Sequence, residues 1–162
     1  MREKSHTTEL RVRGLVVREV LLGETDKLLS VMTAEYGRIP IMAKGARSIK
    51  SHLITSAQLM CYSELTFYER EGRRWLREAS PIEVFYPIRL DIEGFALAQY
   101  FFSICCELFP EGNADGAADM LRLLLNSLYA IMTDLRPQPL IKAAFEFKAM
   151  ALSGFAPDLD GC

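Results

Sequence analysis

The chain has 162 residues, of which 50% are hydrophobic and 25% are charged, an ordinary globular composition that excludes a wholly disordered protein. Its net charge of −2 hides an asymmetry. Residues 1–89 carry 15 Lys and Arg against 11 Asp and Glu, a net +4, whereas residues 90–162 carry 4 against 10, a net −6. Opposite charges in the two parts predict two domains with different partners.

The first half of the chain has the pattern of short strands separated by turn residues. Apolar runs rich in β-branched residues cover residues 11–22, 27–32, 39–43, 59–68 and 74–79. Pro40 cannot donate a ladder hydrogen bond, so the third strand is expected at an edge or at a bulge. Five short strands within ~80 residues predict a small closed or half-closed barrel, and an SH3-like barrel fits this count almost as well.

The second half has the spacing of helices. Asp91 is expected to cap a helix that ends near Leu108, and two further helices are expected over residues 115–132 and 140–152. The middle helix carries few charges, which predicts that it is buried on most sides. Proline and glycine residues punctuate the connections between these segments.

Few residues support catalysis, metal binding or a membrane anchor. The two histidines, His6 and His52, lie in a terminus and beside a basic loop, and no Gly-Lys-Ser/Thr or G-x-G-x-x-G sequence occurs. A small hydrolase therefore ranks last, and no enzyme is predicted. No apolar run reaches the ~20 residues of a bilayer span. The four cysteines, two of them adjacent, favour a reducing cytoplasm over a disulfide framework.

A cationic window is the first feature that indicates a function. Residues 36–63 contain no acid, and they hold Arg38, Lys44, Arg47 and Lys50. Cations of this kind contact phosphates and supply most of the sequence-independent affinity for nucleic acid. The sequence therefore predicts a phosphate-binding segment; the alternative is a solvated loop that only improves solubility.

A second basic cluster surrounds the expected turn after the fourth strand. It consists of Arg70, Arg73, Arg74 and Arg77. Nearby Trp75 and Tyr68 suit stacking on unpaired bases. Glu69, Glu71 and Glu78 partly neutralise the cluster, however, and strand aromatics are more often core residues, which is the favoured interpretation of Trp75.

Four segments in chain order carry a resemblance. They are residues 23–29 (GETDKLL), 35–39 (EYGRI), 43–47 (AKGAR) and 152–162 (LSGFAPDLDGC). Together they resemble the bacterial recombination and repair mediator family RecO, over nearly the whole chain. The resemblance implies an α+β protein of two domains: a basic, DNA-binding OB-fold barrel of five strands over residues 1–82, then an acidic, apolar, all-α domain over residues 83–162.

The resemblance also implies a function and partners. It implies binding to single- and double-stranded DNA and annealing of complementary strands, without catalysis. The implied partners are RecR and the C-terminal tail of single-strand-binding protein, with RecA loaded at gaps as the outcome. Many relatives have a four-cysteine zinc site beginning at the cysteine that matches Cys162. No C-x-x-C pair follows here, so zinc is expected only in a longer form, and the helical domain is expected to be truncated.

A barrel alone does not decide between functions, because small barrels host many of them. The competing hypothesis is a protein-interaction module with no nucleic-acid role. DNA binding that weakens as salt is added separates the two.

Overall fold

A computed structural model describes residues 7–155 of the chain. The chain forms two compact units. One, here called the barrel unit, comprises the described residues up to 31 together with 39–84, and the other, the helical unit, comprises 32–38 and the described residues from 85 onward. The strands are β1 (Glu9–Leu22), β2 (Asp26–Thr33), β3 (Gly37–Ala43), β4 (Tyr62–Arg70) and β5 (Arg73–Glu83).

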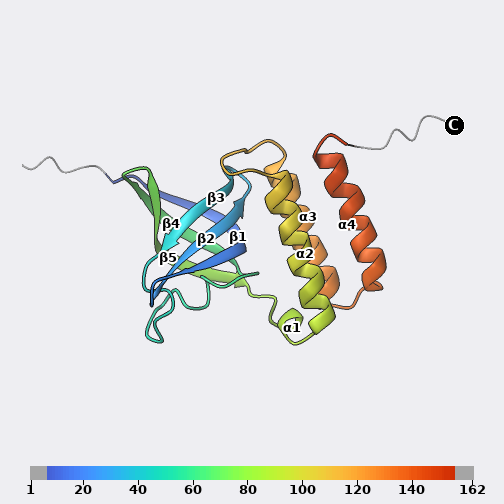
Figure 1. Ribbon diagram of the computed structural model, residues 1–162, viewed down its shortest axis with the longest axis horizontal. Helices are drawn as coiled ribbons and strands as arrows, with labels where there is room; N and C mark the ends of the chain where they lie inside the picture. The colour runs from blue at the N-terminus through green and yellow to red at the C-terminus, as the bar shows by residue number, and fades with distance from the viewer. Residues whose placement is uncertain (1–6, 156–162) are drawn as a thin grey trace, which may run out of the picture. The chain divides into compact units, whose positions relative to one another are not determined.

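The five strands close into a barrel in the order β1-β2-β3-β5-β4 (Figure 1). β1 pairs with β4 antiparallel, with Val12 opposite Leu65, and β4 continues into an antiparallel pair with β5. β5 then meets β3 in parallel, with Met42 opposite Trp75. Inserting β5 between β3 and β4 gives the five-stranded Greek-key barrel of an OB-fold, so the expected fold is confirmed.

The barrel core follows the two-residue period of a strand. Along β4 buried and partly exposed residues alternate, with Leu65 and Phe67 facing inward. Pro40 lies between the buried Ile39 and Ile41 and is itself partly exposed, so it occupies the outward side of β3. The barrel is closed, so β3 is not a free edge strand, which was one of the two positions expected from Pro40.

The helical unit contains α1 (Tyr86–Arg89), α2 (Ile92–Leu108), α3 (Ala117–Met132) and α4 (Gln138–Leu152). The three long helices run side by side (Figure 1). The expected cap of α2 is confirmed, because the Asp91 carboxylate accepts hydrogen bonds from the backbone N–H groups of Glu93 and Gly94, at 3.2 and 3.0 Å. Phe101 of α2 stacks on Phe145 of α4, with ring centroids 4.0 Å apart.

Three local features differ from the expectations. α3 begins at Ala117 because Gly116 precedes it with a left-handed φ of 71°, and it is buried along one broad stripe rather than on most sides. β5 continues through Pro81 to Glu83, with an irregular register against β4 that accommodates the missing N–H. α1 is a single helical turn that the periodicity of the sequence did not predict. Within residues 7–155, no helix has the length and hydropathy needed to cross a bilayer.

Candidate nucleic-acid interface

The connection between β3 and β4, residues 44–61, is here called the cationic loop. Lys44, Arg47 and Lys50 lie in its first half and are exposed. Within the described part of the chain, none of the three forms an ion pair with a carboxylate. The loop contains three successive turns, in which Ser48 N–H donates to Gly45 O, Ser51 N–H donates to Ser48 O, and Ile54 N–H donates to Ser51 O. Each cation therefore directly precedes the first residue of such a turn.

Apolar side chains of the cationic loop hold it against the barrel. Ala46 and Ala57 are fully buried and Leu53 is 3% exposed, and all three belong to the same core cluster as the strand residues. Burial of apolar surface stabilises this arrangement, by about 25 cal/mol for each Å² removed from water. The loop therefore lies on the barrel with its cations in solvent.

The start of the cationic loop is fixed by the turn between β1 and β2 and by Asp26, the first residue of β2. The Asp26 carboxylate accepts a hydrogen bond from Gly45 N–H at 2.8 Å. That bond, a second from the Thr25 hydroxyl and the nearby charge of Lys44 hold the pKa of Asp26 below its ordinary value. Arg47 adds two contacts, from its N–H to Thr25 O at 2.9 Å and from its guanidinium to Gly23 O at 3.0 Å.

The far half of the cationic loop is fixed by the next residue of β2. The Lys27 ammonium, only 11% exposed, donates to Ala57 O at 2.9 Å and to the Glu19 carboxylate at 2.9 Å. Sequence reasoning missed Asp26 and Lys27 as site residues. The available signal was an adjacent acid and base at the start of an otherwise apolar strand.

Arg38 is not part of the cationic loop. It belongs to the helical unit, where its guanidinium donates to Phe109 O at 2.8 Å and to Cys106 O at 3.4 Å and pairs with Glu111. Those carbonyls end α2, where a cation satisfies unpaired acceptors and opposes the helix dipole. With its side chain 12% exposed, Arg38 caps a helix in this structure and offers little surface to a phosphate.

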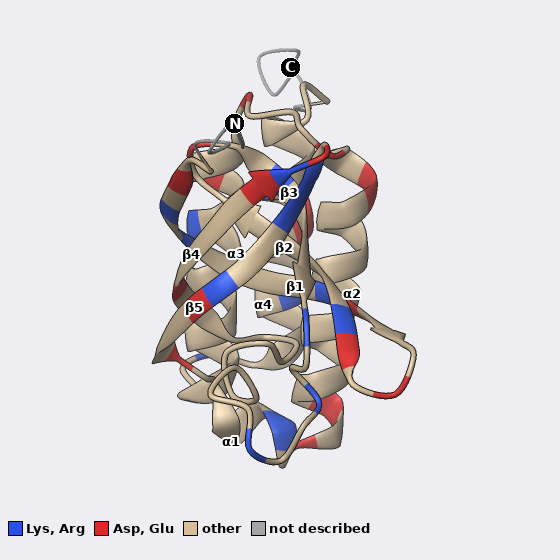
Figure 2. Cartoon of the chain, turned by 90° about the vertical axis from the view of Figure 1, so that its left-hand side faces the viewer, with Lys and Arg blue, Asp and Glu red and all other residues tan. Residues whose placement is uncertain are grey.

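The second basic cluster is spread over the β4–β5 hairpin and mostly paired. Arg70 contacts Glu71, Arg74 contacts Glu69, and Arg77 contacts Glu9 of β1. Arg73 is exposed and forms no ion pair with the residues that the structure describes. Figure 2 shows positive and negative residues side by side along the strands. Exposed pairs of this kind contribute ~0–1 kcal/mol each, so they reduce the local field more than they stabilise the fold.

Trp75 is not the core residue that its surroundings in the sequence favoured. It is partly exposed and stands opposite Tyr68, which is also partly exposed. The adjacent Leu76 and Phe67 also stand opposite each other and fill the core. Because strand side chains alternate between faces, this buried pair places the aromatic pair on the outside of the barrel.

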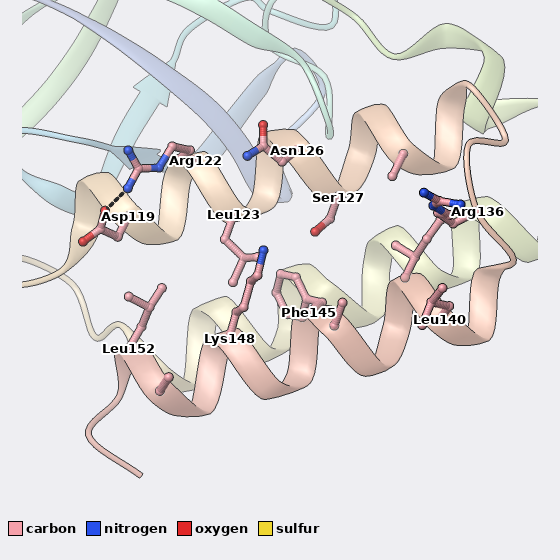
Figure 3. A pocket seen from close by; sticks show the side chains of 14 residues that line it. Asp119, Arg122, Leu123, Asn126, Ser127, Arg136, Leu140, Phe145, Lys148 and Leu152 are labelled. Carbon is pink, nitrogen blue, oxygen red and sulfur yellow. Dashed lines mark hydrogen bonds and ion pairs between the residues drawn. The ribbon is translucent and has the colours of Figure 1, made fainter. Parts of the chain in front are cut away.

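A concave site lies within the helical unit, between α3 and α4 (Figure 3). This groove, here called the α3–α4 groove, has a volume of about 550 Å³. Leu123 from α3 and Phe145 and Leu140 from α4 contribute apolar walls, and Lys148 and Arg136 add positive charge at the rim. Arg122 also lines it but is paired with Asp119.

No group of three or more His, Cys, Asp or Glu is placed to hold a metal ion within residues 7–155. Cys162, the residue on which the zinc prediction depends, lies outside the described residues. Zinc binding therefore stays a prediction.

Comparison with known proteins agrees with this architecture. The family model for the N-terminal part of recombination protein O matches residues 7–85, and the model for its C-terminal part matches residues 89–162. Proteins named DNA repair protein RecO are similar to the chain: one from Acetivibrio thermocellus is 34% identical, and one from Alkaliphilus metalliredigens is 30% identical. Each alignment covers 94% of this chain but only 60% and 61% of the relative, so the chain spans about three fifths of their length. The chain belongs to the RecO family of DNA repair proteins.

Proposed function

We propose that this protein is a non-enzymatic recombination mediator that binds single- and double-stranded DNA through its cationic loop. The observation that carries the proposal is the state of Lys44, Arg47 and Lys50, which are exposed, unpaired with any carboxylate of the described chain, and mounted on a loop anchored at both ends. A loop held in place loses little conformational entropy when it binds DNA, so less of the binding free energy is spent on ordering the loop.

The same arrangement supports annealing of complementary strands. Cations that neutralise phosphates release condensed counterions and reduce the repulsion between two strands. Phosphate contacts carry no sequence information and leave the base edges accessible for pairing. Two strands held this way can pair spontaneously, and the reaction requires no nucleotide hydrolysis. A protein with this role acts at the bacterial nucleoid.

We propose that the helical unit binds the protein partners. We propose that the α3–α4 groove receives the C-terminal tail of single-strand-binding protein, because an apolar floor with Lys148 and Arg136 at its rim fits a peptide carrying apolar and acidic groups. RecR and RecA complete the proposed assembly: with RecR, the protein would help RecA load on strands coated by single-strand-binding protein.

A pair of double variants with the same charge change tests both assignments. Lys44→Glu/Arg47→Glu alters the cationic loop, and Arg136→Glu/Lys148→Glu alters the rim of the groove. The loop variant is expected to lose DNA affinity and annealing rate, measured with labelled oligonucleotides, while still binding a synthetic tail peptide. The groove variant is expected to show the opposite pattern. Circular dichroism confirms that each variant is folded.

Three results would contradict the proposal. Equal loss of DNA binding in both variants would mean that net charge, not the loop, attracts DNA. Unchanged DNA affinity in the loop variant would remove the loop as the binding site. Absence of DNA binding by the unaltered chain at low salt would favour the protein-interaction module instead.

A further inference from the structure

The outward surface of the barrel has an apolar strip that crosses three strands. Tyr68 on β4 stands opposite Trp75 on β5, and Trp75 stands opposite Met42 on β3. All three side chains are partly exposed, whereas the core lies on the other side of the same strands. This set of residues is here called the aromatic strip.

Cations border the aromatic strip on the same face. Arg70 and Arg73 are two residues from Tyr68 and Trp75 along their strands, stand opposite each other, and are exposed. Lys44 is two residues beyond Met42, past the buried Ala43, and is exposed as well. The two-residue period of a strand places these cations on the outward side with the aromatic rings.

Two of the acidic residues near this strip are engaged in ion pairs. Glu9 stands opposite Tyr68, but it is paired with Arg77, and Glu71 is paired with Arg70. Glu78, opposite Thr66, is exposed and forms no ion pair with the residues that the structure describes. Arg73 and Lys44 remain without an ion pair among the described residues. The surface therefore combines flat aromatic rings with positive charge, which is the chemistry that recognises a strand having both exposed bases and phosphates.

We propose that Trp75, with Tyr68 beside it, stacks on unpaired bases of single-stranded DNA and makes the protein prefer single strands to duplex. This inference rests on the proposed DNA-binding function and adds strand selectivity to it. Phosphate contacts from the cationic loop can form with single-stranded or duplex DNA, because both carry phosphates. Bases inside a duplex are already stacked on one another, so only an unpaired strand gains by laying a base on the Trp75 ring.

Trp75 is the single tryptophan of the chain, and this makes the inference directly measurable. Its fluorescence reports the environment of this one ring. Titration with oligothymidylate is expected to quench the emission, because a base stacked on the indole quenches it. A blunt duplex, titrated at the same phosphate concentration, is expected to bind the protein while leaving the Trp75 emission nearly unchanged.

Substitution separates stacking from a structural role. Trp75→Ala is expected to weaken oligothymidylate binding, measured with a labelled oligonucleotide, by about 5- to 150-fold, the range for losing one base–aromatic stack. Trp75→Phe keeps a ring and is expected to recover most of that loss. Duplex affinity is expected to stay within about twofold in both variants. Tyr86→Ala, at an exposed aromatic residue of α1, is the matched control and should leave both affinities unchanged.

Failure of this inference differs from failure of the proposed function. If oligothymidylate binds without quenching, or if folded Trp75→Ala loses single-strand and duplex affinity equally, stacking is refuted while the cationic loop keeps its role. If the unaltered chain binds neither oligothymidylate nor duplex at low salt, the proposed function itself fails and this inference fails with it.

Discussion

Two adjacent residues at the start of β2 have different roles in holding the same loop. Asp26 is a carboxylate acceptor for the backbone of Gly45, and Lys27 is a buried donor to the carbonyl of Ala57. Neither side chain is free to contact DNA in the manner of the exposed cations. We expect both to act on DNA indirectly, by fixing where Lys44 and Arg47 stand.

The role of Asp26 can be tested by whether its removal weakens or strengthens DNA binding. Asp26→Ala and Glu24→Ala each remove one negative charge from neighbouring positions, and electrostatics alone would make both variants bind DNA more tightly. Because only Asp26 holds Gly45, we expect Asp26→Ala to bind an oligonucleotide more weakly than the unaltered protein and Glu24→Ala to bind it equally or more tightly. Tighter binding by both variants would show that anchoring does not matter.

The Asp26 contact also predicts a pH dependence. The pKa of this carboxyl is lowered in the folded chain, chiefly by the Gly45 N–H and then by the Thr25 hydroxyl. Its stabilising effect is therefore complete above the pKa of an unfolded aspartate, about 4, and is lost as the pH falls through the lower folded value. The Gly45 amide proton resonance should stay constant from pH 7 to pH 5 and shift only below about pH 4. A shift centred near pH 6 would contradict this assignment.

At the scale of elements, α2 depends on a glycine that helix propensity disfavours. Replacing Gly94 by Ala raises intrinsic propensity by ~1 kcal/mol. Its Cβ, however, would lie 2.6 Å from Asp91 Oδ2 and 2.9 Å from Ile131 Cγ2, so the cap or the packing against α3 must shift. We expect Gly94→Ala to lower the free energy of unfolding by about 1–3 kcal/mol in urea titrations, as overpacking does.

Ser103→Ala on the exposed side of α2 serves as the control for this prediction, with an expected change within about 0.5 kcal/mol. A Gly94→Ala variant that is more stable than the unaltered protein would show that propensity outweighs the close contacts.

The elements themselves could be predicted because they depend on local patterns. Short apolar runs separated by turn residues located the five strands, and the cap at Asp91 located the start of α2. The number of strands did not distinguish an OB-fold from an SH3-like barrel, because that choice depends on the pairing of β3 with β5. The resemblance to a family, not the periodicity, made that distinction.

The candidate site was less predictable, because its charges depend on contacts between distant residues. The absence of acids near Arg47 along the chain agrees with the structure, in which this guanidinium forms no ion pair with a carboxylate of residues 7–155. The same reasoning could not show that Arg77 meets Glu9 from β1, or that Arg38 caps α2. The prediction that Trp75 is a core residue was wrong. Which face of a strand a residue occupies is known only when its buried neighbours are identified.

At the scale of the whole molecule, the sequence divides into a basic first part and an acidic second part. This division agrees with the separate tasks that we propose, DNA contact for the barrel unit and protein contact for the helical unit. An overall charge of −2 does not prevent DNA binding, since charges act over roughly a Debye length, about 8 Å at physiological salt.

Whether the cationic loop contacts phosphates can be measured from the salt dependence of single-strand binding. Affinity for oligothymidylate is measured over a series of salt concentrations for the unaltered chain and for Lys44→Ala/Arg47→Ala/Lys50→Ala. If the three cations each contact a phosphate, the slope of log affinity against log salt should become less steep by about 2, at ~0.7 for each contact. A folded triple variant with an unchanged slope would contradict the account.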